Sequence, residues 1–491
     1  MADDAVSSGG ADGVLPGWEI VVGLEVHCEL KTRTKLFCGC ANSFGQEPNT
    51  SICPVCLGLP GSLPVINKQA VELAIRIGLS LNCTVDKSIF HRKNYFYPDM
   101  PKDYQVSQYE KAINENGFLE LPLSKKVVRI ERAHIEEDTG KSMHVGGDGG
   151  RIHGAVHSLV DYNRAGIPLV EIVSAPDLRS AEEAREYVTE LRSILVASAA
   201  SDGKMEEGSL RVDANVSVRR LGVEEFGTRC EIKNLNSLRS LVRAIGYEAR
   251  RQVALIESGE KVVQQTRHWN EDQGVTTAMR SKEEAYDYRY FPEPDLVPLE
   301  PSAEWVTEIR SHIGLLPASR RERLTSLFNG VSSGPVYDQI VTAVGLGLDD
   351  LVAGAVAKGA EPRLALARAT NEVASDLGNL EMLTVDNFTE AIRMESEGKL
   401  SATQAKTVLG KMLESGANAR EVAKSLGFEA MDSTVIEGLV DQVIRSSPKE
   451  WERFSSGEDQ LAGFFVGQVM KLSKGKADGK IVTSILRSRR S

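Results

Sequence analysis

The sequence lacks the marks of several common enzyme and membrane classes. No apolar run approaches the roughly 18 residues that a membrane helix needs. There is no G-x-S-x-G elbow and no H-E-x-x-H, so the motifs of serine hydrolases and zincins are missing. The segment TGKS at 139–142 resembles the end of a P-loop, but Ile135 occupies the position of the first glycine of that motif. We therefore expect neither a membrane protein nor a Walker-type ATPase.

The amino-terminal segment also lacks a targeting signal. Residues 1–17 are mostly small and rich in glycine, and the segment has acidic residues near its start. It contains neither the apolar h-region of a secretory signal nor the arginines of a mitochondrial presequence. This composition predicts a disordered tail on a cytoplasmic protein. The net charge of −11 argues against non-specific coating of nucleic acid, although a local basic patch can still bind RNA.

The length and the pattern of the chain predict several domains. A chain of 491 residues, 41% hydrophobic and 26% charged, is long enough for about two to four soluble domains. Strand and helix patterns are mixed without regular alternation up to residue 300, which predicts an α+β domain with a mainly antiparallel sheet over 18–300. Short helical segments then predict a helical domain over 301–400 and a small α-helical tail domain over 401–491.

Periodicity predicts individual elements in the first domain. The run from Trp18 to Leu30 alternates from Leu24 onward, as a strand does, and Ser180 with Glu183 forms a capping-box pattern at the start of a helix. The run 91–110, dense in Tyr, Pro and charge, is typical of a long functional loop. The other expected strands are at 125–137, 166–174, 209–220 and 229–235, and the other expected helices are at 67–81 and 238–259.

Four of the seven cysteines lie within residues 38–56. They form C-x-C, a spacer of twelve residues and C-x-x-C, which is how a chain supplies four thiolates to a tetrahedral Zn²⁺; the ligands would be Cys38, Cys40, Cys53 and Cys56. Four sulfur ligands leave no position for water, so the zinc would be structural. The alternative, a redox C-x-x-C, expects a helix after the motif, but LGLPGSLP follows.

Histidine and carboxylates occur in patterns that suit a cation. Glu25 and His27 are two residues apart on the polar face of a strand, where both can reach one ion, although a solvated strand face is the simpler alternative. HIEED, at 134–138, places a histidine and three carboxylates, Glu136 and Glu137 among them, at the end of another strand, although a run of acids is usually a surface turn. Glu171 is flanked by apolar residues in IPLVEIV and needs a cation or a strong hydrogen bond if it is buried. Such hard ligands favour Mg²⁺ at a phosphoryl-transfer site.

Further polar residues are candidates for contacts with ATP or substrate. Any one of them can also be an ordinary surface group. The candidates are Lys102, Arg164, Glu206, Glu207, Arg211 and Asp213.

The carboxyl-terminal end is basic on an otherwise acidic chain. This charge favours RNA contact, whereas a fraying tail is the simpler alternative. The lysines that we expect to bind tRNA are Lys471, Lys474, Lys476 and Lys480.

Several blocks, in this order, closely resemble the B-subunit family of bacterial aspartyl/glutamyl-tRNA amidotransferases, over almost the whole chain. The resemblance is carried by GLEVHCELKT, FCGC with CPVCLGLPG, FHRKNYFYPDMPKDYQVSQY, HIEEDTGKS, DYNRAGIPLVEIVS, KMEEGSLRVDANVSVR, EIKNLNS and DYRYFPEPDLVPL.

The resemblance implies a function and partners. In this family the B subunit uses ATP to phosphorylate the side-chain carboxylate of Glu misacylated on tRNA-Gln, or of Asp on tRNA-Asn. Ammonia from the glutaminase, which is the A subunit, then displaces the phosphate, and the small C subunit joins the other two. The fold implied is a cradle with a sheet like that of glutamine synthetase, followed by helical and tRNA-binding tail domains.

By motif, the resemblance makes His27, Glu137 and Glu171 the Mg²⁺ ligands, with Glu25 and Glu136 close by, and the four cysteines a structural zinc loop. Two other hypotheses compete with this one: a noncatalytic zinc-stabilised RNA-binding scaffold and a free-standing ligase for a small acid. The pairing of Glu25 with His27 favours an enzyme over a scaffold, and the basic tail favours tRNA over a small substrate.

Overall fold

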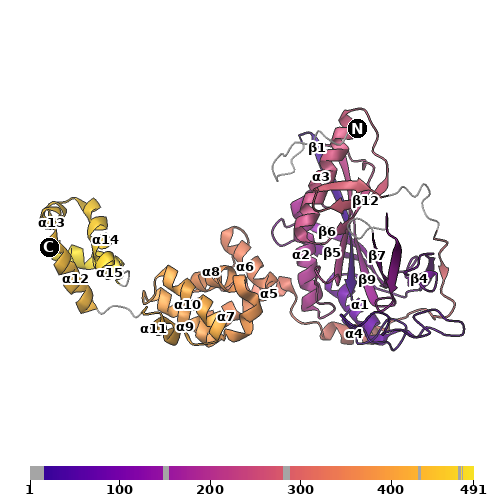
Figure 1. Cartoon of the computed structure of the whole chain (residues 1–491), viewed down its shortest axis with the longest axis horizontal. Coiled ribbons are helices and arrows are strands. Elements are labelled where there is room, and N and C mark those ends of the chain that lie inside the picture. The colour runs from indigo at the N-terminus through magenta and orange to yellow at the C-terminus, as the bar shows by residue number, and fades with distance from the viewer. Residues whose placement is uncertain are drawn as a thin grey trace. The chain divides into compact units, whose positions relative to one another are not determined.

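The computed structural model describes residues 16–146, 154–279, 288–428, 433–473, 477 and 479–490. It divides into two compact units, 1–318 and 319–491. The first unit combines a large sheet with helices, and the second is helical in its described part, so the fold is α+β (Figure 1). Residues 1–15 of the expected tail lie outside the described residues.

The sheets of the first unit contain the following strands: β1 (Trp18–Glu29), β2 (Thr84–Val85), β3 (His91–Asn94), β4 (Tyr104–Ser107), β5 (Asn114–Glu120), β6 (Val127–Glu137), β7 (Lys141–Val145), β8 (His157–Asp161), β9 (Pro168–Ser174), β10 (Leu210–Arg220), β11 (Cys230–Leu235), β12 (Gln265–Asn270), β13 (Val275–Ala278) and β14 (Phe291–Pro292). Its helices are α1 (Lys68–Ser80), α2 (Ala181–Ala197), α3 (Leu238–Glu257) and α4 (Ala303–Ser311).

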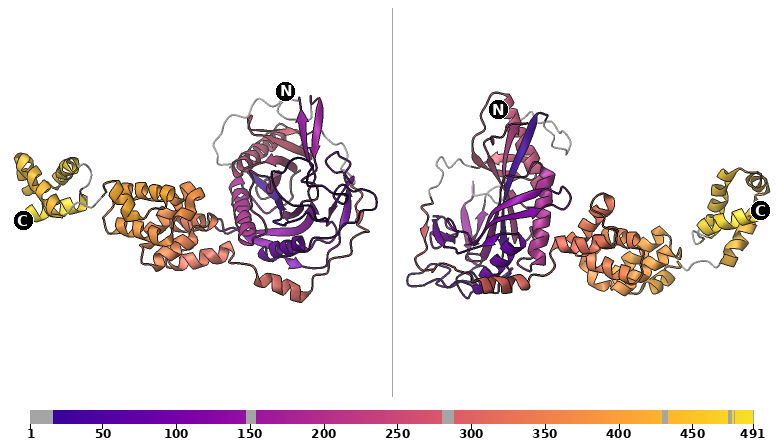
Figure 2. Two further views of the ribbon diagram at one scale, coloured as in Figure 1. Left: turned by 60° about the horizontal axis from the view of Figure 1, so that its bottom comes forward. Right: turned by 180° about the vertical axis from the view of Figure 1, so that it is seen from behind.

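One large sheet organises the first unit, in the order β13-β12-β11-β10-β1-β9-β6-β4-β3-β14, with β2 and β5 attached beside β6. Alternate residues of its central strands point to opposite faces. One face is apolar, as at Val26 and Ile172, and packs against α1, α2 and α3 (Figures 1 and 2). The other face carries the polar residues of the same strands, and the candidate site lies there.

The sheet is mainly antiparallel, as expected, and among its described strands β11 and β12 pair in parallel. One expectation about it needs correction. The run 91–110 is not only a loop, since it supplies β3 and β4, which pair with each other as an antiparallel hairpin. The two strands have only four residues each, and the tyrosines and charged residues of this run gave no strand pattern from which to predict them.

The start of α2 confirms the predicted cap in part. The Ser180 hydroxyl accepts a hydrogen bond from the backbone N–H of Glu183, as an N-cap should. The Glu183 carboxylate accepts from the backbone N–H of Arg179 and not from that of Ser180. The reciprocal half of the capping box is therefore displaced by one residue.

A close approach between α1 and β5 depends on a glycine. A Cβ on Gly78 would lie 1.9 Å from Oδ1 of Asn114, a buried residue whose amide donates to the backbone carbonyls of Ala74 and Ala133. We expect Gly78→Ala to destabilise the first unit by about 2 kcal/mol, because the methyl group must push this amide away from its partners.

Thermal unfolding of Gly78→Ala against Gly410→Ala tests this. Gly410 also lies within a helix, but a Cβ there meets no atom within 4 Å. The free energy of unfolding of Gly410→Ala should therefore rise by about 0.5–1 kcal/mol. Equal melting temperatures for the Gly78 variant and the unmodified chain would contradict the close contact.

The second unit, together with the segment that leads into it, contains the following helices: α5 (Pro317–Ser326), α6 (Pro335–Gly345), α7 (Asp349–Ala357), α8 (Pro362–Asn371), η2 (Val373–Met382), α9 (Val385–Ser396), α10 (Ala402–Ser415), α11 (Ala419–Ser425), α12 (Ser433–Ser446), α13 (Pro448–Ser455), η3 (Asp459–Leu461), α14 (Ala462–Leu472) and α15 (Gly479–Arg490).

The helices of the second unit bury two separate hydrophobic clusters. One runs from Leu324 to Ala423 and the other from Ile436 to Leu486. The break between the clusters therefore lies between residues 423 and 436 and not at the expected position of 400, because α10 and α11 pack with the helices before them.

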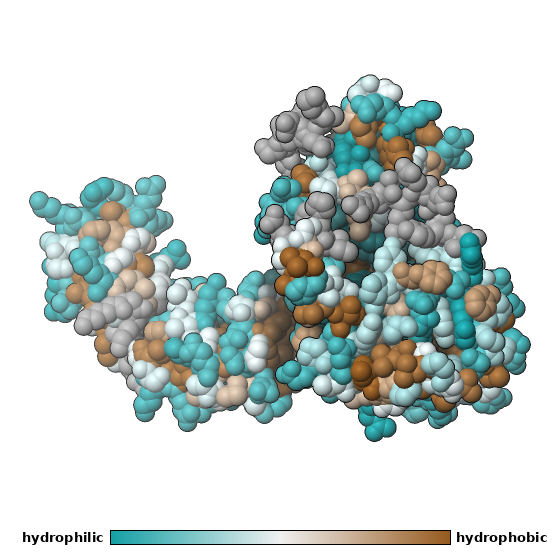
Figure 3. Space-filling view, turned by 45° about the vertical axis from the view of Figure 1, so that its right-hand side comes forward, coloured by the Kyte–Doolittle hydropathy of each residue, from teal (hydrophilic) through white to brown (hydrophobic). Residues whose placement is uncertain are grey.

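The described helices also bear on membrane insertion. None of them alone has the length and hydropathy of a membrane span, and α6 with α7 meets the criteria only jointly, across a bend of 114°. On the face that Figure 3 shows, hydrophobic residues form separate patches between hydrophilic ones.

Candidate active site

Three adjacent strands bring two histidines and a carboxylate into one row on the polar face. Glu171 of β9 lies directly opposite His27 of β1 on one side and His134 of β6 on the other. Glu136 is two residues beyond His134 on β6, so its side chain points to the same face. The register of the central strands therefore assembles this site from three distant segments.

The side chains of this row converge. Nε2 of His27 lies 3.4 Å from Oε1 of Glu136 and 3.8 Å from Oε2 of Glu171, and Nε2 of His134 lies 3.2 Å from the same Glu171 oxygen. Glu136 and Glu171 make no ion pair with a lysine or arginine among the described residues. We call His27, Glu136 and Glu171 the His–Glu group.

Burial and mutual repulsion perturb the two carboxylates. Burial, and after it the charge of Glu171, raises the pKa of Glu136 to about 8. Burial also acts to raise the pKa of Glu171, but the imidazoles of His134 and His27 outweigh it and hold that pKa well below its usual range. Burial lowers the pKa of His27, although the charges of Glu171 and Asp213 act to raise it, so this imidazole can give up its proton to bind a metal.

The His–Glu group fits a divalent cation. One donor atom from each of its three residues can be chosen so that all lie within 4.8 Å of one another. Neighbouring ligands of an octahedral Mg²⁺ are about 3 Å apart, so small side-chain rotations would suffice. His134, which contacts Glu171, would orient that ligand from outside the coordination sphere.

A second acidic group adjoins the first on the same face. Glu25, Asp213 and Glu231 also bring oxygens within 4.8 Å of one another. Lys233 already lies between two of them, with Nζ 2.7 Å from Asp213 and 2.8 Å from Glu231, and Asn215 donates to Glu25. This group is thus partly neutralised by the protein itself, and the His–Glu group is the better candidate for a cation.

The structure does not bring Glu137 to the His–Glu group. Glu137 follows Glu136 on β6, and adjacent strand residues point to opposite faces. Its carboxylate instead accepts hydrogen bonds from Nζ of Lys102, at 2.5 Å, and from the backbone N–H of Val106. Lys102 and Glu137 are both largely buried and form an ion pair of their own beside the cysteine loop.

The remaining predicted substrate residues separate into two sets. Arg164 and Arg211 both contact Asp138, with nitrogen–oxygen distances of 3.3 and 3.0 Å, and Arg211 lies opposite His27 across β1 and β10. Glu206 and Glu207 are exposed in the turn before β10, where Glu207 pairs with Lys204. The structure therefore leaves these two glutamates outside the site.

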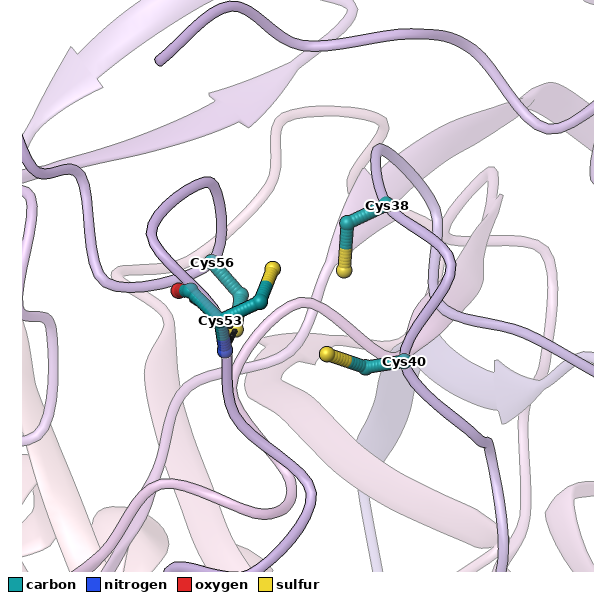
Figure 4. Close-up of side chains that lie close together, drawn as sticks. All are labelled: Cys38, Cys40, Cys53 and Cys56. Carbon is teal, nitrogen blue, oxygen red and sulfur yellow. Dashed lines mark hydrogen bonds between the residues drawn. The ribbon is translucent and has the colours of Figure 1, made fainter. Parts of the chain in front are cut away.

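The four clustered cysteines meet at one point. Figure 4 shows their sulfur atoms directed into a common space, two from each of two turns. One sulfur from each residue lies within 4.8 Å of the others, which fits a tetrahedral Zn²⁺, and the hydrogen bond from Cys38 lowers the pKa of Cys56 to about 5. These cysteines can hold a metal.

The spacer between the cysteine pairs is bound to the segment that leads into β9. Asn49 has a left-handed backbone conformation. Its backbone N–H donates to the Asp161 carboxylate and its side-chain amide to the Val160 carbonyl, both at 3.0 Å, and its side-chain oxygen accepts from the backbone N–H of Tyr162 at 2.8 Å. Ser51 donates to Asn163 in the same segment. The cysteine loop therefore holds residues 160–163, directly before Arg164, as well as the chain after β1.

The expected tRNA-binding lysines are described only in part. Lys471 lies in the last turn of α14 and Lys480 in the first turn of α15, whereas Lys474 and Lys476 lie outside the described residues. The last arginines are engaged within the tail, because Arg489 pairs with Asp441 and Glu437, and Arg490 pairs with Asp459. The positive charge available to a partner is thus smaller than the sequence indicates.

Several site residues were not predicted, or were predicted only as part of a block. His134 and Asp138 stand in the HIEED block, but only the register of β6 shows that His134 contacts Glu171. Glu231 and Lys233 alternate with apolar residues in RCEIKNL, and this strand pattern is the signal that could have indicated a polar face.

Comparisons with known proteins identify the family of the chain. The family described as the GatB/GatE catalytic domain matches residues 20–307, and the GatB domain matches residues 350–489. The B subunit of the aspartyl/glutamyl-tRNA(Asn/Gln) amidotransferase of Thermodesulfovibrio yellowstonii is 45% identical over 480 residues, covering 96% of this chain and 98% of the relative. The protein of the same name from a Mycobacterium species is 48% identical over 491 residues, covering 97% of each. The chain therefore belongs to the GatB family of amidotransferase B subunits.

Proposed function

We propose that this chain is the subunit that activates and amidates misacylated Glu-tRNA(Gln) or Asp-tRNA(Asn), using ATP and Mg²⁺. The observation that carries the proposal is the His–Glu group, in which two neighbouring carboxylates meet an imidazole without a described lysine or arginine partner. Two such acids share a partly buried site either by retaining a proton or by binding a cation, and only a cation lets both ionise. The names of the relatives supply the tRNA substrate.

The chemistry needs two displacements. A side-chain carboxylate oxygen of the aminoacyl group attacks the γ-phosphorus of ATP, the bond to ADP breaks, and an acyl phosphate forms. Ammonia then attacks the acyl carbon, phosphate leaves, and the nitrogen loses a proton to give the amide. A bound Mg²⁺ supplies charge stabilisation to the transferring phosphoryl group.

Residues of this chain would perform the remaining tasks. His27, Glu136 and Glu171 would hold the cation, and His134 would fix the orientation of Glu171. Arg211 of β10, directly opposite His27 of β1, lies where it can meet phosphate oxygens if it leaves Asp138. Glu25 and Asp213, on the adjoining group, can add a second cation contact once Lys233 is displaced.

A cavity of about 190 Å³ on the same face supports an ATP site. Its lining includes Gly23, Glu25, Asn215, Phe226 and Arg229. An aromatic ring, an amide and a guanidinium beside a cation group offer a base, a ribose and phosphates their usual partners. We therefore place the nucleoside of ATP in this pocket.

The partners follow from the same proposal. Ammonia would come from the glutaminase, or A subunit, with the C subunit joining the two, in the cytoplasm. The first unit would form the cradle with a glutamine synthetase-like sheet, and Lys471, Lys480 and the other tail lysines would contact tRNA. The cysteine loop would hold a structural Zn²⁺, which stabilises the loop without taking part in the reaction.

Reconstitution with the A and C subunits tests the function. We expect glutamine-dependent amidation of misacylated Glu-tRNA(Gln) or Asp-tRNA(Asn) that needs both ATP and Mg²⁺ and releases one ADP for each amide. Omitting ATP should abolish the product. A complex that binds tRNA tightly but amidates neither substrate would instead favour the noncatalytic RNA-binding scaffold.

A further inference from the structure

Two stacked tyrosines border the His–Glu group. The rings of Tyr109 and Tyr290 lie 4.0 Å apart between centroids and are nearly parallel, at 7°. The ring of Tyr288 meets Tyr290 edge-on at 6.0 Å, and Nζ of Lys93 lies 4.6 Å from the Tyr288 centroid. We call Tyr109 and Tyr290 the tyrosine ledge.

The ledge keeps surface that a ligand can reach. Tyr109 is 50% exposed although its ring stacks on Tyr290 and meets the ring of His91 edge-on at 6.3 Å, whereas Tyr290 is half-buried. Packing alone would explain a contact between the end of β4 and the start of β14. It does not explain why a large aromatic side chain in that contact remains half-exposed to solvent. A flat half-exposed aromatic surface beside a cation is how proteins bind unpaired nucleobases.

The ledge is close to the reacting groups. Glu136 pairs with Ser107 of β4, two residues before Tyr109. Burial, and after it the charges of Glu136 and Glu171, raises the pKa of Tyr290, which places this ring within electrostatic range of both carboxylates. A base stacked on the ledge would therefore bring its own sugar near the His–Glu group.

The ledge and the proposed ATP pocket lie on opposite sides of that group. Across the sheet, the pocket is lined mainly by residues of β10, β1 and β9, and the His–Glu group lies on β1, β9 and β6. The ledge residues follow β4 and precede β14, which lie further along the same strand order. In-line phosphoryl transfer needs the attacking and leaving oxygens on opposite sides of phosphorus, so a donor in the pocket requires the acceptor to enter from the side of the ledge.

We propose that the tyrosine ledge stacks the adenine of the 3′-terminal adenosine of tRNA, the nucleoside whose ribose carries the misacylated amino acid. This rests on the proposed function. Adenine also occurs in ATP, so the same aromatic chemistry has two sources. The positions of the pocket and the ledge assign ATP to the first and the tRNA end to the second, with Lys93 near enough to meet a backbone phosphate.

A binding cycle tests the assignment without any chemistry. The complex with the A and C subunits is titrated with deacylated tRNA that carries or lacks its terminal adenosine. For the unmodified protein, removing the adenosine should weaken binding about tenfold. Tyr109→Ala should bind the full-length tRNA about tenfold more weakly and should lose its sensitivity to the missing adenosine, whereas Tyr109→Phe should behave as the unmodified protein.

Controls separate this role from packing and from ATP binding. Phe118→Ala removes a similarly exposed aromatic ring from β5 and should leave the cycle unchanged. Unchanged ATP affinity in Tyr109→Ala supports the assignment to tRNA. Weaker ATP binding with normal tRNA binding would overturn it, and so would equal sensitivity to the terminal adenosine in Tyr109→Ala and the unmodified protein.

The two proposals fail differently. If the proposed function is wrong, the unmodified complex forms no ADP with misacylated tRNA, whatever the binding cycle shows. If only the ledge is misassigned, ADP and amide form normally while Tyr109→Ala retains its dependence on the terminal adenosine.

Discussion

Glu171→Gln is expected to slow ADP formation from ATP and misacylated tRNA by about 10³-fold while tRNA affinity stays unchanged. The substitution preserves the size of the side chain and its contact with His134, but it removes one of the two charges that would hold the cation. The tail, not this face of the sheet, is the proposed tRNA contact outside the terminal nucleotide. Single-turnover ADP release and tRNA titration of the same preparation measure the two effects.

Stability separates Glu171 from its neighbours. Removing the charge of Glu171 relieves the repulsion that raises the pKa of Glu136, but it also loses the attraction of His134 and His27 that holds the pKa of Glu171 low. Because these two effects oppose each other, the melting temperature of Glu171→Gln should change little. Glu137→Gln should lower the melting temperature, since it leaves Lys102 buried without its carboxylate. Glu120→Gln, an exposed carboxylate at the end of β5, is the neutral control. Full ADP release by Glu171→Gln would sink the assignment of the site.

The sequence predicted the members of this site better than their grouping. The spacing of Glu25 and His27 on a strand, and a carboxylate at Glu171 among apolar residues, each indicated a functional group by itself. Which of Glu136 and Glu137 joins them depends on the register of β6 against β9, because one residue of shift exchanges the two faces. Periodicity within a single strand carries no information on that register.

Other parts of the fold were predicted unevenly for similar reasons. Local patterns were enough to predict α1, α2 and α3, because the apolar stripe and the cap of each helix lie within one short segment of the sequence. The parallel pairing of β11 with β12 and the short strands β3 and β4 depend on partners distant in the chain. The four cysteines are the opposite case, since their spacing in the sequence was enough to predict that their sulfurs meet.

The contacts of the cysteine loop change what zinc is expected to stabilise. From the sequence, the loop only follows the strand that carries Glu25 and His27. In the structure its spacer is hydrogen-bonded through Asn49 to residues 160–162, and Leu36 donates to the carbonyl of Gly166. Arg164, which contacts Asp138, lies between these attachment points.

Cys53→Ser is therefore expected to lose zinc and to lower the melting temperature of the first unit by several degrees, with the largest gain in hydrogen exchange at residues 157–166. Metal content, thermal unfolding and exchange of the same variant measure this. Cys83→Ala, at a buried cysteine outside the cluster, should keep its zinc. Because none of the four sulfurs touches the His–Glu group, activity should fall only as the segment around Arg164 loosens. A variant that keeps its melting temperature and its exchange protection but forms no ADP would place the cysteines in the chemistry instead.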